Sequence, residues 1–317
     1  MDGSKIDGLD PTKFQNPDVT AKGEARASVA FTNPTTLWFN TGTLCNIECV
    51  NCYIESSPKN DALVYLTADE VDDYLEQIKT QNWPIKEIAF TGGEPFMNPD
   101  MIEMTRRSLA RGFEVLILTN AMRPMMRRSI QKGLLELQKD YSDKLTLRIS
   151  LDHHTAENHD VMRGKNSYDV TLQGMDWLRD NGFRMAVAAR TLWNETDAEN
   201  RAGFAALFEE RGYDIDAQNP AMTVLFPEMD ETVDVPEITT ACWGILNKNP
   251  DDIMCASSRM VVKRKGADKP AVIACTLLPY DAEFELGESL AEAEGAVKLN
   301  HPHCAKFCVL GGASCSA

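Results

Sequence analysis

Short apolar runs alternate with amphipathic stretches along most of the chain. The apolar runs have the length and composition of strands, and the stretches between them repeat apolar residues at helical spacing. Strands are predicted at residues 36–40, 87–91, 114–119, 145–151, 184–190 and 221–226. Helices are predicted from residue 67 onward, and over about 99–112, 125–140, 167–182 and 197–212. Strands that are apolar throughout imply a parallel sheet covered by helices, so the predicted fold class is α/β.

The two ends of the chain do not follow this alternation. Residues 1–34 are polar and are predicted to form an arm, whereas residues 35–235 carry the strand–helix units. Residues 236–317 hold six of the nine cysteines. This stretch contains a predicted hairpin over 260–266 and 271–274, and helical periodicity is visible only at 288–296. We therefore predict a small cysteine-rich C-terminal module.

Composition and charge exclude several classes of protein. No apolar run reaches the ~20 residues of a membrane helix, and the first residues lack the basic and apolar regions of a signal peptide. We therefore expect a cytoplasmic protein with no membrane partner. A net charge of −16 argues against a nucleic-acid partner, because phosphate backbones are bound through clustered Lys and Arg.

The densest chemistry lies in Cys45-Asn-Ile-Glu-Cys49-Val-Asn-Cys52-Tyr53. Three thiols in one short loop can converge on one soft metal centre. Structural zinc usually takes four protein ligands, so three cysteines suit a [4Fe–4S] cluster whose fourth iron stays open. A structural metal knuckle and buried free thiols are the alternatives.

The Cys-x3-Cys-x2-Cys spacing resembles the signature of the radical S-adenosylmethionine (SAM) family. The resemblance implies a partial (β/α)6 barrel in which the open iron binds SAM. An electron delivered by a reductase, flavodoxin or ferredoxin then cleaves SAM to methionine and a 5′-deoxyadenosyl radical, which abstracts hydrogen from a substrate. In this family an aromatic or apolar residue often precedes the third cysteine, where its backbone faces adenine. Here Asn51 stands at that position and Tyr53 follows the cysteine, so we include Tyr53 among the cofactor-binding candidates.

Further candidates follow the predicted strands, where chemistry gathers in parallel α/β folds. Gly92-Gly93-Glu94 resembles the family motif that holds the SAM amino group, and a carboxylate there would complement the ammonium. Ser150 resembles the ribose-contacting position of the family. The remaining cofactor-binding candidates at strand ends are Thr119, Asn120, Asp152 and Arg190, of which Arg190 is the candidate partner of the methionine carboxylate.

Catalytic candidates are less specific. His153, His154 and Arg163 follow the fourth predicted strand, and a histidine titrating near neutral pH can relay protons. Binding to substrate or SAM through hydrogen bonds is the alternative role. No catalytic residue is assigned from the sequence.

The C-terminal cysteines loosely resemble the auxiliary-cluster extensions called SPASM and twitch. Such a resemblance implies one [4Fe–4S] cluster held by Cys255, Cys275 and two of Cys304, Cys308 and Cys315. A zinc site built from the same ligands is the alternative.

These features predict a radical SAM enzyme that acts on a small molecule or a short peptide. Two alternatives remain open at this point. One is a maturase of ribosomal peptides with a separate recognition partner, and the other is a non-catalytic iron–sulfur or zinc scaffold.

Overall fold

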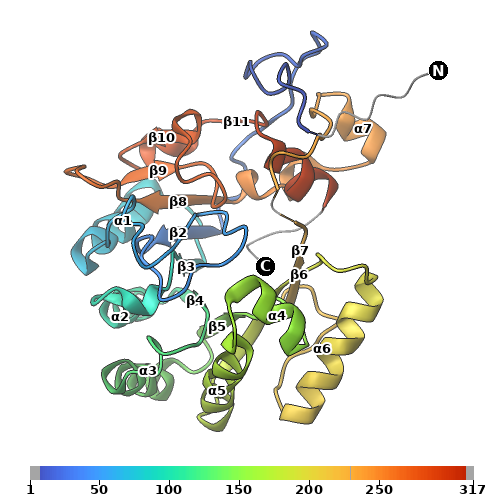
Figure 1. Cartoon of the computed structure of the whole chain (residues 1–317). Coiled ribbons are helices and arrows are strands. Elements are labelled where there is room, and N and C mark those ends of the chain that lie inside the picture. The colour runs from blue at the N-terminus through green and yellow to red at the C-terminus, as the bar shows by residue number, and fades with distance from the viewer. Residues whose placement is uncertain (1–7, 229, 312–317) are drawn as a thin grey trace.

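The fold is an open, mostly parallel sheet with helices along its outer face (Figure 1). The structure is a computed structural model that describes residues 8–228 and 230–311. Cys315 therefore lies outside the described residues. The central strands are β2 (Thr36–Asn40), β3 (Glu87–Thr91), β4 (Glu114–Thr119), β5 (Leu145–Ser150), β6 (Arg184–Arg190) and β7 (Thr223–Phe226). All six predicted strands are confirmed, to within two residues at their ends.

The helices that cover this sheet are α1 (Ala68–Gln81), α2 (Met101–Ala110), α3 (Arg128–Tyr141), α5 (Ser167–Asp180) and α6 (Asp197–Arg211). Helix α1 starts at the predicted capping box, in which Thr67 accepts from the backbone N–H of Glu70 and Glu70 reaches back to the backbone of Thr67. Helix α3 begins three residues later than predicted. A short helix that was not predicted, α4 (Ala156–Arg163), follows β5.

The C-terminal residues extend the same sheet. Strand β8 (Ser258–Val262) pairs in parallel with β2, and β9 (Ala271–Ile273) and β10 (Glu285–Gly287) continue antiparallel. The strand order is β10-β9-β8-β2-β3-β4-β5-β6-β7, so β10 and β7 are its edges. The predicted hairpin is confirmed as β8 and β9. The fold is thus the predicted α/β partial barrel with a cysteine-rich C-terminal region, which includes α7 (Cys242–Leu246) and a π-helix at Cys304–Leu310.

The helix suggested by the periodicity at 288–296 is wrong. In its place lies a 3₁₀ turn at Ala291–Glu294, and β11 (Val297–Lys298) follows directly after the predicted range. Strand β11 pairs with β1 (Ser28–Val29) of the N-terminal arm. Gly295 already has extended backbone, so the chain leaves helical geometry after the 3₁₀ turn and enters β11. The predicted domain boundaries stay predictions.

The core has two parts because the central strands are buried on both faces. Leu37 and Phe39 of β2 face the helices, whereas Trp38 points to the opposite face. There Trp38 belongs to one apolar cluster with C-terminal side chains such as Met260 and Phe307. The C-terminal region therefore covers the inner face of the sheet beside β2. No helix in the described part of the chain is long and apolar enough to cross a membrane.

Candidate functional site

The three cysteines that follow β2 line one pocket at the carboxyl edge of the sheet. Cys45 is buried, and its backbone N–H donates to the carbonyl of Ser57 at 3.0 Å. Cys49 and Cys52 are partly exposed. Most of the predicted cofactor-binding residues line the same pocket, namely Tyr53, Gly92, Gly93, Thr119, Asn120, Ser150 and Arg190, together with Arg163.

The two glycines after β3 allow the cysteine loop to lie directly against them. The N–H of Gly93 donates to the carbonyl of Gly42 at 2.9 Å, and that of Glu94 donates to the carbonyl of Leu44 at 3.2 Å. A Cβ on Gly93 would lie 2.3 Å from the Leu44 oxygen. Gly92 has φ +144°, and a Cβ there would lie 2.6 Å from the Gly42 oxygen. Glycine is therefore required at both positions to hold the loop that carries Cys45.

Glu94 is buried behind this turn and is not among the residues that line the pocket. The Thr119 hydroxyl lies 2.9 and 3.0 Å from the two carboxylate oxygens of Glu94 and donates to them. The same carboxylate accepts from the backbone N–H groups of Asn120 and Phe96. Burial raises the pKa of Glu94 to about 7, against these hydrogen bonds, which lower it. In this structure Glu94 thus orders the turn after β4. Its predicted contact with an ammonium group stays a prediction.

Asp152 ties two arginines to the cysteine loop. Arg163, at the end of α4, donates to both carboxylate oxygens of Asp152, at 2.8 and 2.9 Å, and its Nη1 lies 3.9 Å from the Sγ of Cys49. Arg190 lies 3.5 Å from Asp152 and donates to the carbonyls of Val50 and Asn51. Burial would raise the pKa of Asp152, but Arg163 and Arg190 lower it overall. Asp152 therefore stays ionised and aligns both guanidinium groups, which themselves line the pocket.

The thiols fit a metal cluster better than they fit free cysteines. Burial, the largest cause, raises the pKa of Cys45 to about 12, so a lone thiol there stays protonated and inert. A bound metal centre deprotonates its thiol ligands outright. The guanidinium of Arg163 beside Cys49 then supplies positive charge next to the added thiolates. Three convergent thiols, polar groups and two cations could hold a [4Fe–4S] cluster and a small zwitterionic ligand.

A second group of cysteines lines a separate small apolar cavity. Cys255, Cys275, Cys304 and Cys308 are all buried around it, with Leu277, Phe284 and His303 among its other lining residues. Burial raises the pKa of Cys255 and of Cys304, so these thiols also need a metal to ionise. Of the predicted set, the structure brings these four together. The Sγ of Cys242 instead accepts from the N–H of Thr239 and does not line the cavity.

Two predicted catalytic candidates lie elsewhere. His153 and His154 are not among the residues that line the cysteine pocket, whereas Arg163 is. His153 is buried and hydrogen-bonded to Glu195, which lies in the β6–α6 connection. The predicted catalytic role of the histidines stays untested.

Sequence reasoning missed Asn46 and Ser56. Asn46 accepts from the side chain of Asn120 at 2.9 Å and thereby couples the cysteine loop to β4. Ser56 lines the pocket, and its buried hydroxyl has no hydrogen-bond partner within the described residues. No sequence signal marks Ser56, because a single serine in a polar loop is common. Asn46 could have been suspected only from its place beside Cys45.

Comparisons with known proteins agree with this geometry. The profile of the radical SAM superfamily matches residues 39–201. The chain is 33% identical to the antilisterial bacteriocin subtilosin biosynthesis protein AlbA of Bacillus subtilis (strain 168), over 48% of this chain and 33% of that protein. It is 30% identical to the AdoMet-dependent heme synthase of Methanosarcina barkeri (strain Fusaro / DSM 804), over 49% of this chain and 42% of that protein. The matched region thus spans less than half the length of these relatives.

Solved structures share the fold at low identity. Streptococcus suis SuiB bound to S-adenosylmethionine has a TM-score of 0.58 at 12% identity, covering 81% of this chain and 63% of that one. The anSMEcpe structure with bound AdoMet has a TM-score of 0.56 at 14% identity, covering 82% of this chain and 77% of that one. The profile match covers half of the sequence, and both the cysteine loop and the glycine turn lie within it. The chain belongs to the radical SAM superfamily.

Proposed function

We propose that this chain is a radical SAM enzyme that modifies a peptide, with one auxiliary [4Fe–4S] cluster. The observation that carries the proposal is the single pocket that brings together Cys45, Cys49 and Cys52 with the Gly92-Gly93 turn and Arg163. A scaffold that only binds metal has no use for a polar, cationic pocket beside its cysteines. The family match to residues 39–201 supports the same conclusion.

Each part of the pocket has a separate task in this proposal. The three thiolates hold a [4Fe–4S] cluster, which when loaded and reduced supplies the electron that splits SAM into methionine and a 5′-deoxyadenosyl radical. Arg163 and Arg190, aligned by Asp152, neutralise the methionine carboxylate. Ser150, Asn120 and Ser56 offer hydrogen bonds to the remaining polar groups of SAM. The backbone around Gly92 and Gly93 shapes the position of the amino group.

Cys255, Cys275, Cys304 and Cys308 are the proposed ligands of the auxiliary cluster. Their burial around one apolar cavity supports four thiolate ligands and leaves little room for a water ligand. Zinc at the same four ligands is the competing possibility. We further propose residues 35–235 as the SAM-binding unit and residues 236–317 as the auxiliary-cluster unit, preceded by the arm 1–34.

A peptide is the proposed substrate class because of the relatives. AlbA is named as a bacteriocin biosynthesis protein, other relatives are mycofactocin maturases, and SuiB was solved with its precursor peptide SuiA. A small molecule is the second candidate, since two Methanosarcina relatives are named as synthases of heme and Fe-coproporphyrin III. In either case we propose a cytoplasmic enzyme that takes electrons from a flavodoxin, ferredoxin or reductase.

The proposal can be tested by iron content and SAM cleavage under anaerobic conditions. Three proteins would be reconstituted: wild type, a Cys45/Cys49/Cys52→Ala triple variant and a Cys304→Ala/Cys308→Ala double variant. We expect about eight irons in the wild type and about four in each variant. After addition of SAM and dithionite, 5′-deoxyadenosine should form in wild type and the double variant only.

Two controls make the result decisive. Cys242→Ala removes a cysteine outside both pockets and should change neither iron nor cleavage. Zinc that is present in the triple variant, which keeps the four C-terminal cysteines, and absent from the double variant would identify a zinc site instead of an auxiliary cluster. Absence of 5′-deoxyadenosine from fully loaded wild type, tested with and without candidate peptides, would contradict the proposed reaction.

A further inference from the structure

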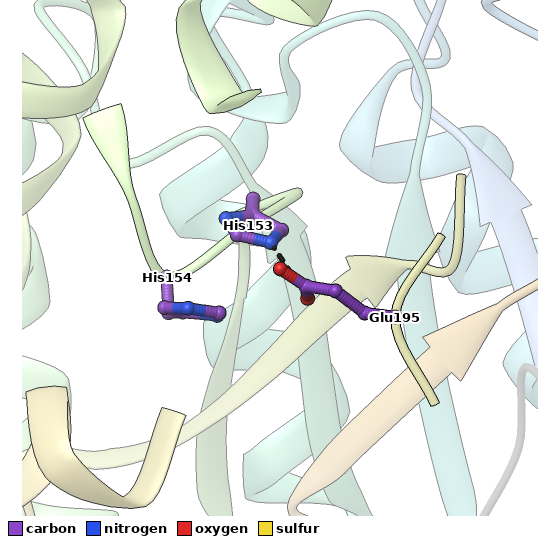
Figure 2. Close-up of side chains that lie close together, drawn as sticks. All are labelled: His153, His154 and Glu195. Carbon is purple, nitrogen blue, oxygen red and sulfur yellow. Dashed lines mark hydrogen bonds and ion pairs between the residues drawn. The ribbon is translucent and has the colours of Figure 1, made fainter. Parts of the chain in front are cut away.

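Two adjacent histidines and a glutamate from different connections meet beside the barrel edge. His153 and His154 follow β5, and Glu195 comes from the segment between β6 and α6 (Figure 2). One ligand atom from each residue lies within 4.8 Å of the others. Nothing in the SAM pocket requires this arrangement, because His153, His154 and Glu195 are not among its lining residues.

The two imidazole rings lie unusually close to each other. Their centroids are 4.0 Å apart, with 30° between the ring planes. The Nε2 of His153 lies 3.0 Å from a carboxylate oxygen of Glu195, and Trp193 packs edge-on against the ring of His153. The ring nitrogens and the carboxylate thus place lone pairs of three side chains close together, as a metal ion requires.

His154 supplies an independent observation that points to a ligand. Its Nδ1 is buried and has no partner of good hydrogen-bond geometry among the described residues, although the side chain of Asn200 lies close enough to interact with the ring. Its ring is held in place by Gly203 of α6, where a Cβ would approach the ring atoms to 2.4 Å, and by edge contact with Phe204. A buried polar atom without a partner is costly, and ligation is one way to satisfy it.

We propose that His153, His154 and Glu195 bind a divalent first-row transition-metal ion. Two imidazoles and one carboxylate form a donor set used for Zn²⁺ with an open fourth position, and also for Fe²⁺. The carboxylate, whose side chain is 31% exposed, leaves an entry path for the ion and a place for water. The site is independent of the iron–sulfur clusters because it contains no cysteine.

Metal binding requires a change in the hydrogen bonds of both ring nitrogens of His153. In the structure the backbone N–H of Thr155 donates to Nδ1 of His153 at 3.0 Å, and the Thr155 hydroxyl lies 2.9 Å from the same atom. When Nε2 binds the metal, Nδ1 carries the proton and donates to that hydroxyl, and the backbone N–H of Thr155 gives up Nδ1 as its acceptor. A donor contact of this kind from the second ring nitrogen is the usual support for a metal-bound histidine.

The ion would join two connections that both reach the SAM pocket. His153 directly follows Asp152, which aligns Arg163 and Arg190, and Arg190 ends β6 five residues before Glu195. The proposed role of the ion is therefore to position this edge of the barrel. It takes no part in the SAM cleavage proposed above.

The test is a metal titration of the full-length, anaerobically reconstituted protein. Zn²⁺ and, in a second series, Fe²⁺ would be titrated in competition with a chromophoric chelator, after total iron has shown that both cysteine sites are loaded. We expect about one additional equivalent per chain in wild type. Loss of a contact that only supports a ligand costs 10–100-fold in affinity, so Glu195→Gln should weaken binding by about 100-fold or more.

Two matched variants and one spectrum keep the test falsifiable. Glu157→Gln changes an exposed carboxylate of α4 and should bind as wild type does. His301→Asn removes a member of a second cluster, Glu231/His301/His303, and should also bind normally. X-ray absorption at the zinc edge of wild type should report nitrogen and oxygen ligands only. Equal affinity of Glu195→Gln and wild type, or sulfur ligands at the zinc, would overturn the proposal even if a variant folds poorly.

Discussion

Replacing Gly93 by alanine tests how the glycine turn holds the cysteine loop. A Cβ at this position would lie 2.3 Å from the Leu44 oxygen, 2.6 Å from the Leu44 carbonyl carbon and 2.7 Å from the Thr43 oxygen. All three atoms belong to backbone, so no side chain can rotate away. The loop must retreat by about 1 Å to reach ordinary van der Waals contact. The backbone conformation of Gly93 itself is open to alanine, because its φ is not positive.

The energetic cost follows from overpacking. Forcing extra atoms into a packed contact typically costs about 1–3 kcal/mol. This movement of the loop would also lengthen two hydrogen bonds. In the wild-type structure the N–H of Gly93 lies 2.9 Å from the carbonyl oxygen of Gly42, and the N–H of Glu94 lies 3.2 Å from that of Leu44. Cys45 follows Leu44 directly, so its thiol moves with the loop. We therefore expect both lower stability and poor cluster loading.

Urea unfolding of the apo-protein and iron content after reconstitution measure the two effects. Gly93→Ala should lower the free energy of unfolding by about 1–3 kcal/mol and should lose most of the iron bound by the first three cysteines. Gly244→Ala is the matched control, since a Cβ there meets nothing within 4 Å. It lies in α7 and should keep its iron and gain up to about 1 kcal/mol. Wild-type stability and full iron content in Gly93→Ala would refute the reasoning.

Two further predictions concern buried charges. The pKa of Glu94, raised from 4.5 to about 7 by burial, means that the folded state binds this proton more tightly than the unfolded state. The stability that this tighter proton binding contributes is present below pH 4.5 and is lost as pH rises to 7. The difference in unfolding free energy between wild type and Glu94→Gln should therefore change between these two pH values. A difference that stays constant would contradict the burial argument. Arg26 pairs with Glu237 at 2.5 Å, and the two side chains are 0% and 6% exposed. Arg26→Ala leaves this buried carboxylate without its cation, hydrogen-bonded to the backbone N–H groups of Phe14 and Ala21, and should cost about 3–5 kcal/mol in urea unfolding. Lys13→Ala, which breaks the more exposed pair with Asp234, should cost at most about 1 kcal/mol, and equal losses in the two variants would count against the difference in burial.

The alternating part of the fold was predictable because its signals are local. Each strand from β2 to β7 is a short apolar run. The capping box formed by Thr67 and Glu70 marks the start of α1. The pairing of β8 with β2 was not predictable in this way. These strands lie more than 200 residues apart, and the composition of an apolar run does not indicate which distant strand it pairs with.

The candidate site was predictable where a motif carries it. The cysteine loop and Gly92-Gly93 meet in one pocket as expected, since both follow strands that pair side by side. The orientation of Glu94 could not be foreseen, because it depends on the donors that Thr119 and Asn120 present from β4. Glu195 was missed because only tertiary structure brings it to His153, 42 residues earlier in the chain.

The position of β8 beside β2 also has a consequence for the order of folding during synthesis. All strands from β2 to β7 are complete once residue 226 has been made, but β2 keeps an unpaired edge until residues 258–262 follow. An open, apolar strand edge invites pairing with other chains. Pairings so far apart in sequence also form slowly. The nascent partial barrel is therefore the aggregation-prone stage of this protein, and C-terminal truncations that remove β8 should be recovered mainly as insoluble material.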